Sequence, residues 1–231
     1  MTGAPIPYSF GNDNLLQTLF LFNILGIAYV FVLNGGSVLQ RIKSLFYYSR
    51  NSKPYNNQTH INRVCNLILY AQCVFSLSVL AFTQARYDCG ALYLKNSYIY
   101  IGTYVLFFAL VIVLKRLTYD IVNHILFTEH QKREWRNSYF FTMQLTGLLL
   151  FPLTTALLIL PEVPQQAFTI YLTSSALIYL LMLIKQCKGI IFSQKPYFLD
   201  IILYLCTLEI IPIAVLVKAI RELNLFLTIN F

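Results

Sequence analysis

Six long apolar segments dominate this sequence and limit what the chain can fold into. They cover residues 14–33, 64–84, 97–114, 139–160, 167–184 and 198–217. Each is close to the ~20 residues that an α-helix needs to cross the hydrocarbon core of a bilayer. Charged residues make up 11% of the chain, against roughly 25% in a typical soluble domain. Because the segments leave no room for a soluble domain, we expect an all-α integral membrane protein, with residues 1–231 forming a single domain of six transmembrane helices.

The basic residues are distributed unevenly between the connections of these segments. If the N-terminus lies outside, thirteen of the seventeen fall in the inner connections: Arg41, Lys43, Arg50, Lys53, Arg63, Lys115, Arg116, Lys132, Arg133, Arg136, Lys185, Lys188 and Lys195. The opposite orientation would place all of them outside, against the positive-inside rule. We therefore expect both termini on the outer side of the membrane. The net charge of +8 follows from this topology and does not indicate a nucleic-acid partner.

Two amphipathic segments follow the first and third apolar segments. In residues 37–46 the apolar side chains share one helical face, while Arg41 and Lys43 lie elsewhere, and residues 117–126 repeat this pattern. We expect two short helices on the inner face of the membrane, with their cations toward anionic headgroups. Such helices bind membrane lipid, and a partner protein is the alternative occupant. The inner basic face that we predict comprises Arg41, Lys43, Arg50, Lys115, Arg116, Arg133 and Arg136.

The sixth apolar segment carries a carboxylate, Glu209, near its middle. A charged group at that depth costs at least ~2.5–3.5 kcal/mol on a surface that faces lipid. We therefore expect Glu209 to face other helices, either protonated or hydrogen-bonded. Pro212 has no N–H to donate to the carbonyl of Leu208, so an unpaired acceptor is expected beside this carboxyl group.

Other polar residues lie deep within the predicted spans. Gln72 and Gln144 are candidates for buried polar groups, and Tyr204 lies close to Glu209 in the sequence. We expect Gln72 to find a partner on another helix. Pro152, like Pro212, is expected to interrupt its helix.

The sequence contains no recognisable catalytic motif: G-x-S-x-G, Walker and H-E-x-x-H patterns and a dinucleotide fingerprint are all absent. The acid nearest to Glu209, Asp200, lies about 13 Å along the helix, too far for a direct dyad. Two His–carboxylate pairs spaced i,i+4 within residues 120–134 make a metal site the alternative interpretation, but structural zinc sites usually have four closely spaced ligands. We therefore expect no catalytic residues, no cofactor and no metal.

Several short motifs carry a resemblance to a known family. They are PIPYSFGNDN at 5–14, FYYSR at 46–50, FTQ at 82–84, LKRLTYDIVN at 114–123, Trp135, FPL at 151–153, Lys185 with Cys187, and LYLCTLEIIP at 203–212. With these residues the chain resembles an inner-membrane family of Bacteroidota, the domain-of-unknown-function family numbered forty-two seventy-one. The resemblance implies a bacterial cytoplasmic-membrane protein, with both termini then periplasmic. It implies no activity, but it favours Glu209, Tyr204 and the N-terminal proline-rich segment as functional candidates.

Three functions are compatible with these features. The first is a non-enzymatic accessory or scaffold subunit that binds other integral membrane proteins of the envelope, supported by small outer loops and two inner amphipathic segments. The second is a small transporter or proton-linked channel that uses Glu209, with Gln72, Gln144 and Tyr204 as neighbours. The third is a membrane-embedded enzyme acting on a lipid-linked substrate, supported only by the basic inner face. We expect the first.

Overall fold

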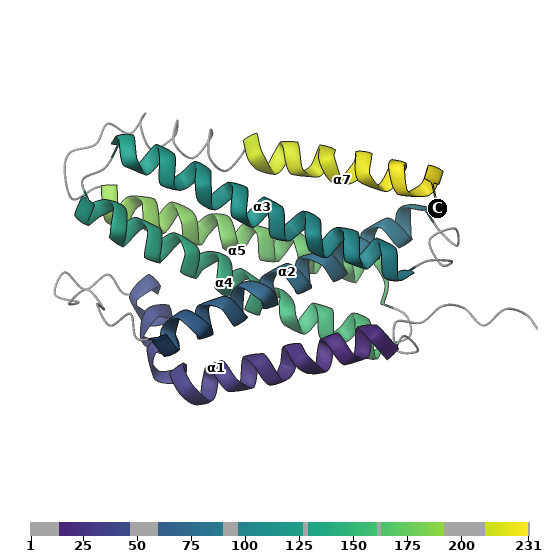
Figure 1. Cartoon of the computed structure of the whole chain (residues 1–231), viewed down its shortest axis with the longest axis horizontal. Coiled ribbons are helices and arrows are strands. Elements are labelled where there is room, and N and C mark those ends of the chain that lie inside the picture. Colours follow the sequence, from purple (N-terminus) through teal and green to yellow (C-terminus); the bar gives the residue numbers. More distant parts are fainter. Residues whose placement is uncertain are drawn as a thin grey trace, which may run out of the picture.

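The computed structural model describes residues 14–46, 60–89, 97–126, 129–160, 163–191 and 211–230, and these residues are almost entirely helical. Six helices lie side by side along the long axis of the molecule (Figure 1). They are α1 (Asn14–Phe46), α2 (His60–Cys89), α3 (Ser97–Leu126), α4 (Glu129–Ile159), α5 (Gln165–Ile191) and α7 (Ile211–Asn230). The predicted all-α class is confirmed.

Five of these helices are long and apolar enough to cross a membrane, as expected for a membrane-embedded protein. Their spanning windows are Leu16–Gly36, Arg63–Tyr87, Tyr98–Ile121, Tyr139–Ile159 and Gln165–Ile184, close to the first five predicted segments. The sixth segment differs. Helix α7 begins at Ile211, continues past Val217 to Asn230, and is not one of the five spans. Residues 198–210 lie outside the described residues, so the sixth span stays a prediction.

Helix α1 bends at Asn34, where the predicted first segment meets Asn34-Gly35-Gly36. The backbone at Asn34 is not helical, with φ −132° and ψ 15°. The chain resumes its helix beyond this point and continues to Phe46, so the end of α1 turns away from its first part (Figure 1). Asn-Gly and Gly-Gly pairs favour such a break, and the amphipathic segment 37–46 is the part of α1 that follows it.

Helices α3 and α4 extend beyond their apolar segments at one end of the bundle. The sequence predicted a separate amphipathic helix over residues 117–126, but α3 continues through these residues without interruption. No Gly or Pro lies between Lys115 and Leu126, so nothing in the backbone ends the helix there. Helix α4 begins at Glu129, ahead of the predicted start at Tyr139, because the intervening residues are good helix formers.

The core of the bundle lies around α2 and α4. Half of the spanning window of each is buried, compared with 11% for α1, 22% for α3 and 17% for α5. The main apolar cluster joins α2, α3 and α4 through side chains such as Phe82, Tyr104 and Leu157. Large apolar side chains are exposed on the outer helices, for example Phe22 on α1 and Leu106 on α3. Such surfaces suit a hydrocarbon solvent.

The alternation of helix direction brings the last residues of α1, α3 and α5 to the same end as the first residues of α2 and α4 (Figure 1). We call this the basic end, because most of the predicted inner cations belong to these helix ends. Those within the helices are Arg41, Lys43, Arg63, Lys115, Arg116, Lys132, Arg133, Arg136, Lys185 and Lys188. The shared location fits the charge pattern, and which side of the membrane this end faces stays a prediction. Arg50 lies outside the described residues.

Candidate functional site

Two of the predicted polar candidates, Glu209 and Tyr204, lie outside the described residues. Pro212 is the second residue of α7 as described. Because the residues directly before Ile211 lie outside the described residues, the predicted interruption at Pro212 stays a prediction.

The two predicted glutamines are both buried, on α2 and α4. Gln144 donates from Nε2 to the carbonyl of Asn66 at 3.3 Å and so links α4 to α2. Gln72 donates from Nε2 to Ser76 Oγ at 3.2 Å. The expectation of a partner on another helix is therefore wrong for this bond, because Ser76 lies one turn further along α2 on the same face. Gln72 Oε1 is buried without a hydrogen-bond partner among the described residues.

The closest approach of α2 and α4 involves Gly147, which sequence reasoning missed. A Cβ atom built on Gly147 would lie 2.8 Å from both Cα and Cβ of Cys73. Only a residue without a side chain lets the two backbones pass at this distance. The signal available in the sequence was a glycine within an otherwise helical apolar segment.

Helix α4 remains helical across Pro152, so the predicted interruption does not end or divide it. The proline still removes the N–H that would bond the Leu148 carbonyl. Around this point the helix is supported by side chains. The Tyr171 hydroxyl of α5 donates to the Leu149 carbonyl at 2.6 Å. The hydroxyls of Thr154 and Thr155 donate to the carbonyl of Phe151.

Because hydrogen bonds between membrane helices average only ~0.6 kcal/mol, we expect Tyr171→Phe to lower the free energy of unfolding by a similar amount. Denaturant titration of the purified protein in mixed micelles measures it. Thr173→Val is the matched control, since the Thr173 hydroxyl bonds only to carbonyls of its own helix, Thr169 and Ile170. A loss equal to that of the control would show that the Tyr171 bond does not hold α4 and α5 together.

Helix α7 is attached to the bundle through apolar packing and one buried polar contact. Its side chains Leu216, Ile220 and Leu223 pack against the main apolar cluster. The Tyr104 hydroxyl of α3 donates to Asn224 Oδ1, with both side chains buried. This bond fixes the position of α7 along α3.

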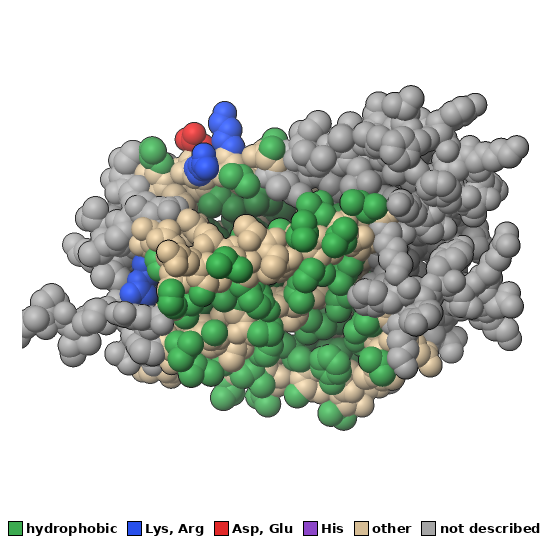
Figure 2. All heavy atoms as spheres, turned by 180° about the vertical axis from the view of Figure 1, so that it is seen from behind, with side chains coloured by type: hydrophobic (Ala, Val, Ile, Leu, Met, Phe, Trp, Pro, Cys, Tyr) green, Lys and Arg blue, Asp and Glu red, His purple; other side chains and the backbone are tan. Residues whose placement is uncertain are grey.

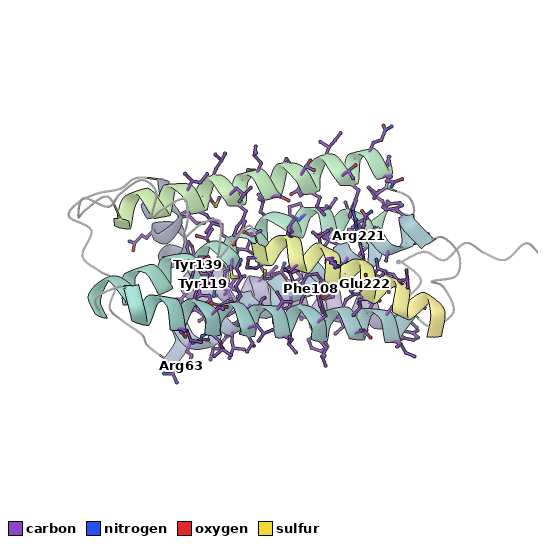
Figure 3. All side chains as sticks on the ribbon, turned by 90° about the horizontal axis from the view of Figure 1, so that it is seen from above. Arg63, Phe108, Tyr119, Tyr139, Arg221 and Glu222 are labelled. Atoms are coloured by element: carbon purple, nitrogen blue, oxygen red, sulfur yellow. The ribbon has the colours of Figure 1, made fainter. Side chains whose placement is uncertain are left out.

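The exposed face of α7 carries three charged residues, Lys218, Arg221 and Glu222. Tyr104 lies six residues inside the spanning window of α3, or about 9 Å at 1.5 Å per residue. Arg221 and Glu222 lie within one turn of its partner Asn224. Lys218 lies six residues before Asn224, which places it about 9 Å from Asn224 toward the middle of the bundle. Lys218 and Arg221 are among the four basic residues that the predicted topology leaves on the outer side, after the sixth segment. Figure 3 shows Arg221 and Glu222 along the side of the bundle.

The surface is hollowed between α7 and α5, beside these charges (Figure 2). On α5 the exposed side chains include Thr169, Thr173 and Ser174. Each of their hydroxyls donates to a carbonyl of α5 itself, so they add little polarity to this face. Small residues of this kind allow another helix to approach closely. We call the hollow beside the charged face of α7 the α5–α7 groove.

A second group of charges lies at the basic end, where the predicted residues Lys115 and Arg116 are consecutive on α3. Lys115 Nζ lies 5.6 Å from the ring centroid of Tyr139 on α4 and 5.9 Å from that of Tyr179 on α5. The Arg116 guanidinium lies 5.6 Å from the ring centroid of Phe140, the residue after Tyr139. Two successive cations of α3 therefore lie over two successive rings of α4.

Within the helices as described, no three His, Cys, Asp or Glu residues gather as metal ligands would. Among the described residues, the positioned polar groups include the Gln72–Ser76 and Gln144–Asn66 bonds in the core, the Tyr104–Asn224 bond, the α5–α7 groove and the cations at the basic end. None of them pairs a nucleophile with a base.

Comparison with known proteins gives a family and no closer relative. Neither the curated proteins nor the solved structures contain a match to this chain. A family model described as "Domain of unknown function (DUF4271)" matches residues 17–220. This match runs from α1 into α7 and includes Lys115, Arg116 and Lys218, while Arg221 and Glu222 lie beyond its last residue. The chain belongs to the DUF4271 family.

Proposed function

We propose that this protein is a non-enzymatic accessory subunit of the bacterial cytoplasmic membrane, with both termini periplasmic, and that it binds another integral membrane protein through the α5–α7 groove. The observation that carries the proposal is the position of Lys218, Arg221 and Glu222. These residues are exposed, yet they lie beside the spanning part of α3. A charged side chain exposed to lipid there would cost ~2.5–3.5 kcal/mol near the bilayer centre.

The charged side chains of α7 leave its backbone pointing away from the nearer membrane surface, which makes this cost harder to avoid. The Cα–Cβ bonds of a helix tilt toward its N-terminus. The N-terminal end of α7 lies about halfway along α3 (Figure 1). Lys218 and Arg221 therefore leave the backbone toward the middle of the bundle, and reaching the nearer membrane surface requires them to turn back. A protein surface that supplies acceptors at this depth removes the conflict.

Charge complementarity indicates what the partner presents. Lys218 and Arg221 are one turn apart on the same face, and Glu222 is the i,i+4 neighbour of Lys218. The excess of positive charge fits a helix that carries a carboxylate within its membrane span. Such carboxylates are rare in lipid-facing positions and are usually paired with a basic group.

A second copy of this chain fits the groove less well. Copies of one chain insert in the same orientation, so a two-fold axis between them runs along the membrane normal and makes the two α7 helices parallel. Lys218 would then face Lys218, and Arg221 would face Arg221. Like charges at close range and low dielectric repel strongly. We therefore assign the groove to a different protein.

Site-specific crosslinking in native membranes tests this assignment. A photo-crosslinking amino acid at Lys218 is expected to give one protein adduct of defined mass. The same amino acid at Phe22, on the exposed face of α1, is expected to give only lipid adducts. The adduct's own sequence must contain a carboxylate within a transmembrane segment. If the amino acid at Lys218 and at Phe22 gave adducts with the same set of proteins, this result would contradict the proposal.

Charge reversal then tests the pairing itself. Because truncating or reversing one partner of a buried pair costs ~2–5 kcal/mol, Lys218→Glu should weaken recovery of the partner at least ~10-fold. Exchanging the partner's carboxylate for lysine should restore it. Arg63→Glu, an exposed cation at the basic end, is the matched control and should leave recovery unchanged. If Lys218→Glu still binds the partner normally, the groove is not the docking site.

A further inference from the structure

We propose that Lys115 and Arg116, with the rings of α4 and α5 around them, form a binding site for the phosphate headgroup of one anionic phospholipid. The site lies at the basic end, away from the α5–α7 charges, and does not depend on the proposed function. It is distinct from general attraction of exposed cations to headgroups, because its cations are held by contacts with neighbouring helices.

The first observation is where the Lys115 side chain goes. A lysine at the end of a transmembrane helix usually extends along its own helix to reach water. Lys115 is half-buried, and its ammonium group lies between the rings of Tyr139 and Tyr179, which belong to two other helices. Tyr139 is itself buried and stacks with Tyr119 of α3, with ring centroids 4.0 Å apart (Figure 3). The ammonium position is therefore fixed from three helices.

The second observation is the donors of Arg116. Its guanidinium is exposed and lies over Phe140 in the same manner. An aromatic face interacts with the charge of a cation but accepts few of its protons. The arginine side chain has five N–H donors. Phosphate oxygens are the acceptors that such paired cations bind best. One carboxylate, Asp120, follows on α3 and leaves the group with a net positive charge.

The third observation is the apolar surface beside the cations. On α3, Val113 is exposed one turn before Arg116, on the same side of the helix. The exposed Leu110 and Leu106 continue from Val113 at helical spacing and extend this hydrocarbon surface from the cations toward the middle of the bundle. A free phosphate ion would use only the cations. A phospholipid would use both, and basic pockets between membrane helices are typical sites for anionic headgroups.

Native mass spectrometry of the purified full-length protein tests the site. The probes are dioleoylphosphatidylglycerol, and dioleoylglycerol, which has the same acyl chains and no phosphate. We expect one molecule of phosphatidylglycerol to bind at least ~10-fold more tightly than dioleoylglycerol, since a hydrogen bond to a charged group contributes ~1.5–3 kcal/mol. Equal affinity for the two lipids would overturn the proposal without any variant.

Matched substitutions locate the site. Lys115→Met and Arg116→Gln should each lower the affinity for phosphatidylglycerol about 10-fold or more. Lys218→Met and Arg221→Gln remove the same charges from α7 and should not change it. Equal losses in both sets would show that only net charge matters and would overturn the site. If Lys115→Met does not fold, the affinity of Arg116→Gln and the comparison of the two lipids still test the site.

A soluble phosphate ester tests whether the site binds a phospholipid or a free phosphate group. Glycerol 3-phosphate, which has no acyl chains, is added at the same concentration as the lipid while thermal unfolding is followed by size-exclusion chromatography. We expect phosphatidylglycerol to raise the Tm of wild type and glycerol 3-phosphate to leave it unchanged. An equal rise in Tm with glycerol 3-phosphate would mean that the site takes free phosphate esters, and the lipid assignment would be wrong.

Discussion

Gly147→Ala is expected to destabilise the protein more than any other single-methyl change in the described helices. The new Cβ would lie 2.8 Å from Cα and Cβ of Cys73, so α2 and α4 must separate. Overpacking of this kind typically costs ~1–3 kcal/mol and sometimes more. The new Cβ would clash with the backbone of Cys73. Neither α2 nor α4 can move away without displacing the core side chains that it carries. Denaturant titration in mixed micelles measures the loss of unfolding free energy.

Gly102→Ala is the matched control for this change. Gly102 lies in α3, and a Cβ atom there would meet nothing within 4 Å. Because alanine has a higher helix propensity than glycine, this variant should be neutral or up to ~1 kcal/mol more stable. Cys73→Ala should not rescue Gly147→Ala, since the contact involves Cα and Cβ of Cys73 and not its sulfur. Equal stability of the two glycine variants would mean that the helices are not held this closely.

Asn224→Ala is expected to loosen α7 from the bundle. The substitution leaves the buried Tyr104 hydroxyl without the Asn224 oxygen to which it donates, and an unsatisfied buried polar group costs ~1–3 kcal/mol. Tyr104→Phe should have a similar effect from the other side of the bond. Replacing both polar partners by apolar residues, Tyr104→Phe with Asn224→Leu, should recover most of the stability, because no buried polar atom is then left over.

A double-mutant cycle on these two positions measures the bond. The coupling free energy should fall within the ~0.6–1.7 kcal/mol found for hydrogen bonds between membrane helices. Thr103→Val is the control, since the Thr103 hydroxyl donates only to the carbonyl of Ile99 in its own helix. Additive effects of Tyr104→Phe and Asn224→Ala would show that the contact does not hold α7 in place.

The five spans and the bend at Asn34 could be predicted because they depend on local sequence. The length of an apolar segment determines whether a helix can cross a bilayer. An Asn-Gly-Gly sequence interrupts a helix wherever it occurs. The basic end was predictable for the same reason, since charge counts follow from the order of segments. The extension of α3 to Leu126 was not predicted, because a change from apolar to amphipathic pattern was interpreted as a new helix.

The contacts that hold the helices together could not be predicted, since they depend on which residues face each other. Nothing local to Gly147 names Cys73 as its neighbour, and nothing local to Asn224 names Tyr104. The same limit applies to the depth of Lys218 and Arg221, because the bond that sets the height of α7 joins residues of two helices far apart in sequence. Glu209, on which the transporter alternative depends, lies outside the described residues and stays a hypothesis.

The pairing of α2 with α4 has a consequence for how this protein matures during synthesis. These two helices run in the same direction, and their closest contact joins Cys73 and Gly147, which are 74 positions apart (147 − 73). At ~5–20 residues per second, the ribosome needs about 4–15 s to add that stretch. During this interval the buried face of α2 must be sheltered by the insertion machinery or by the neighbouring α1 and α3. Assembly of the bundle therefore waits for the fourth helix, however quickly each earlier one enters the bilayer.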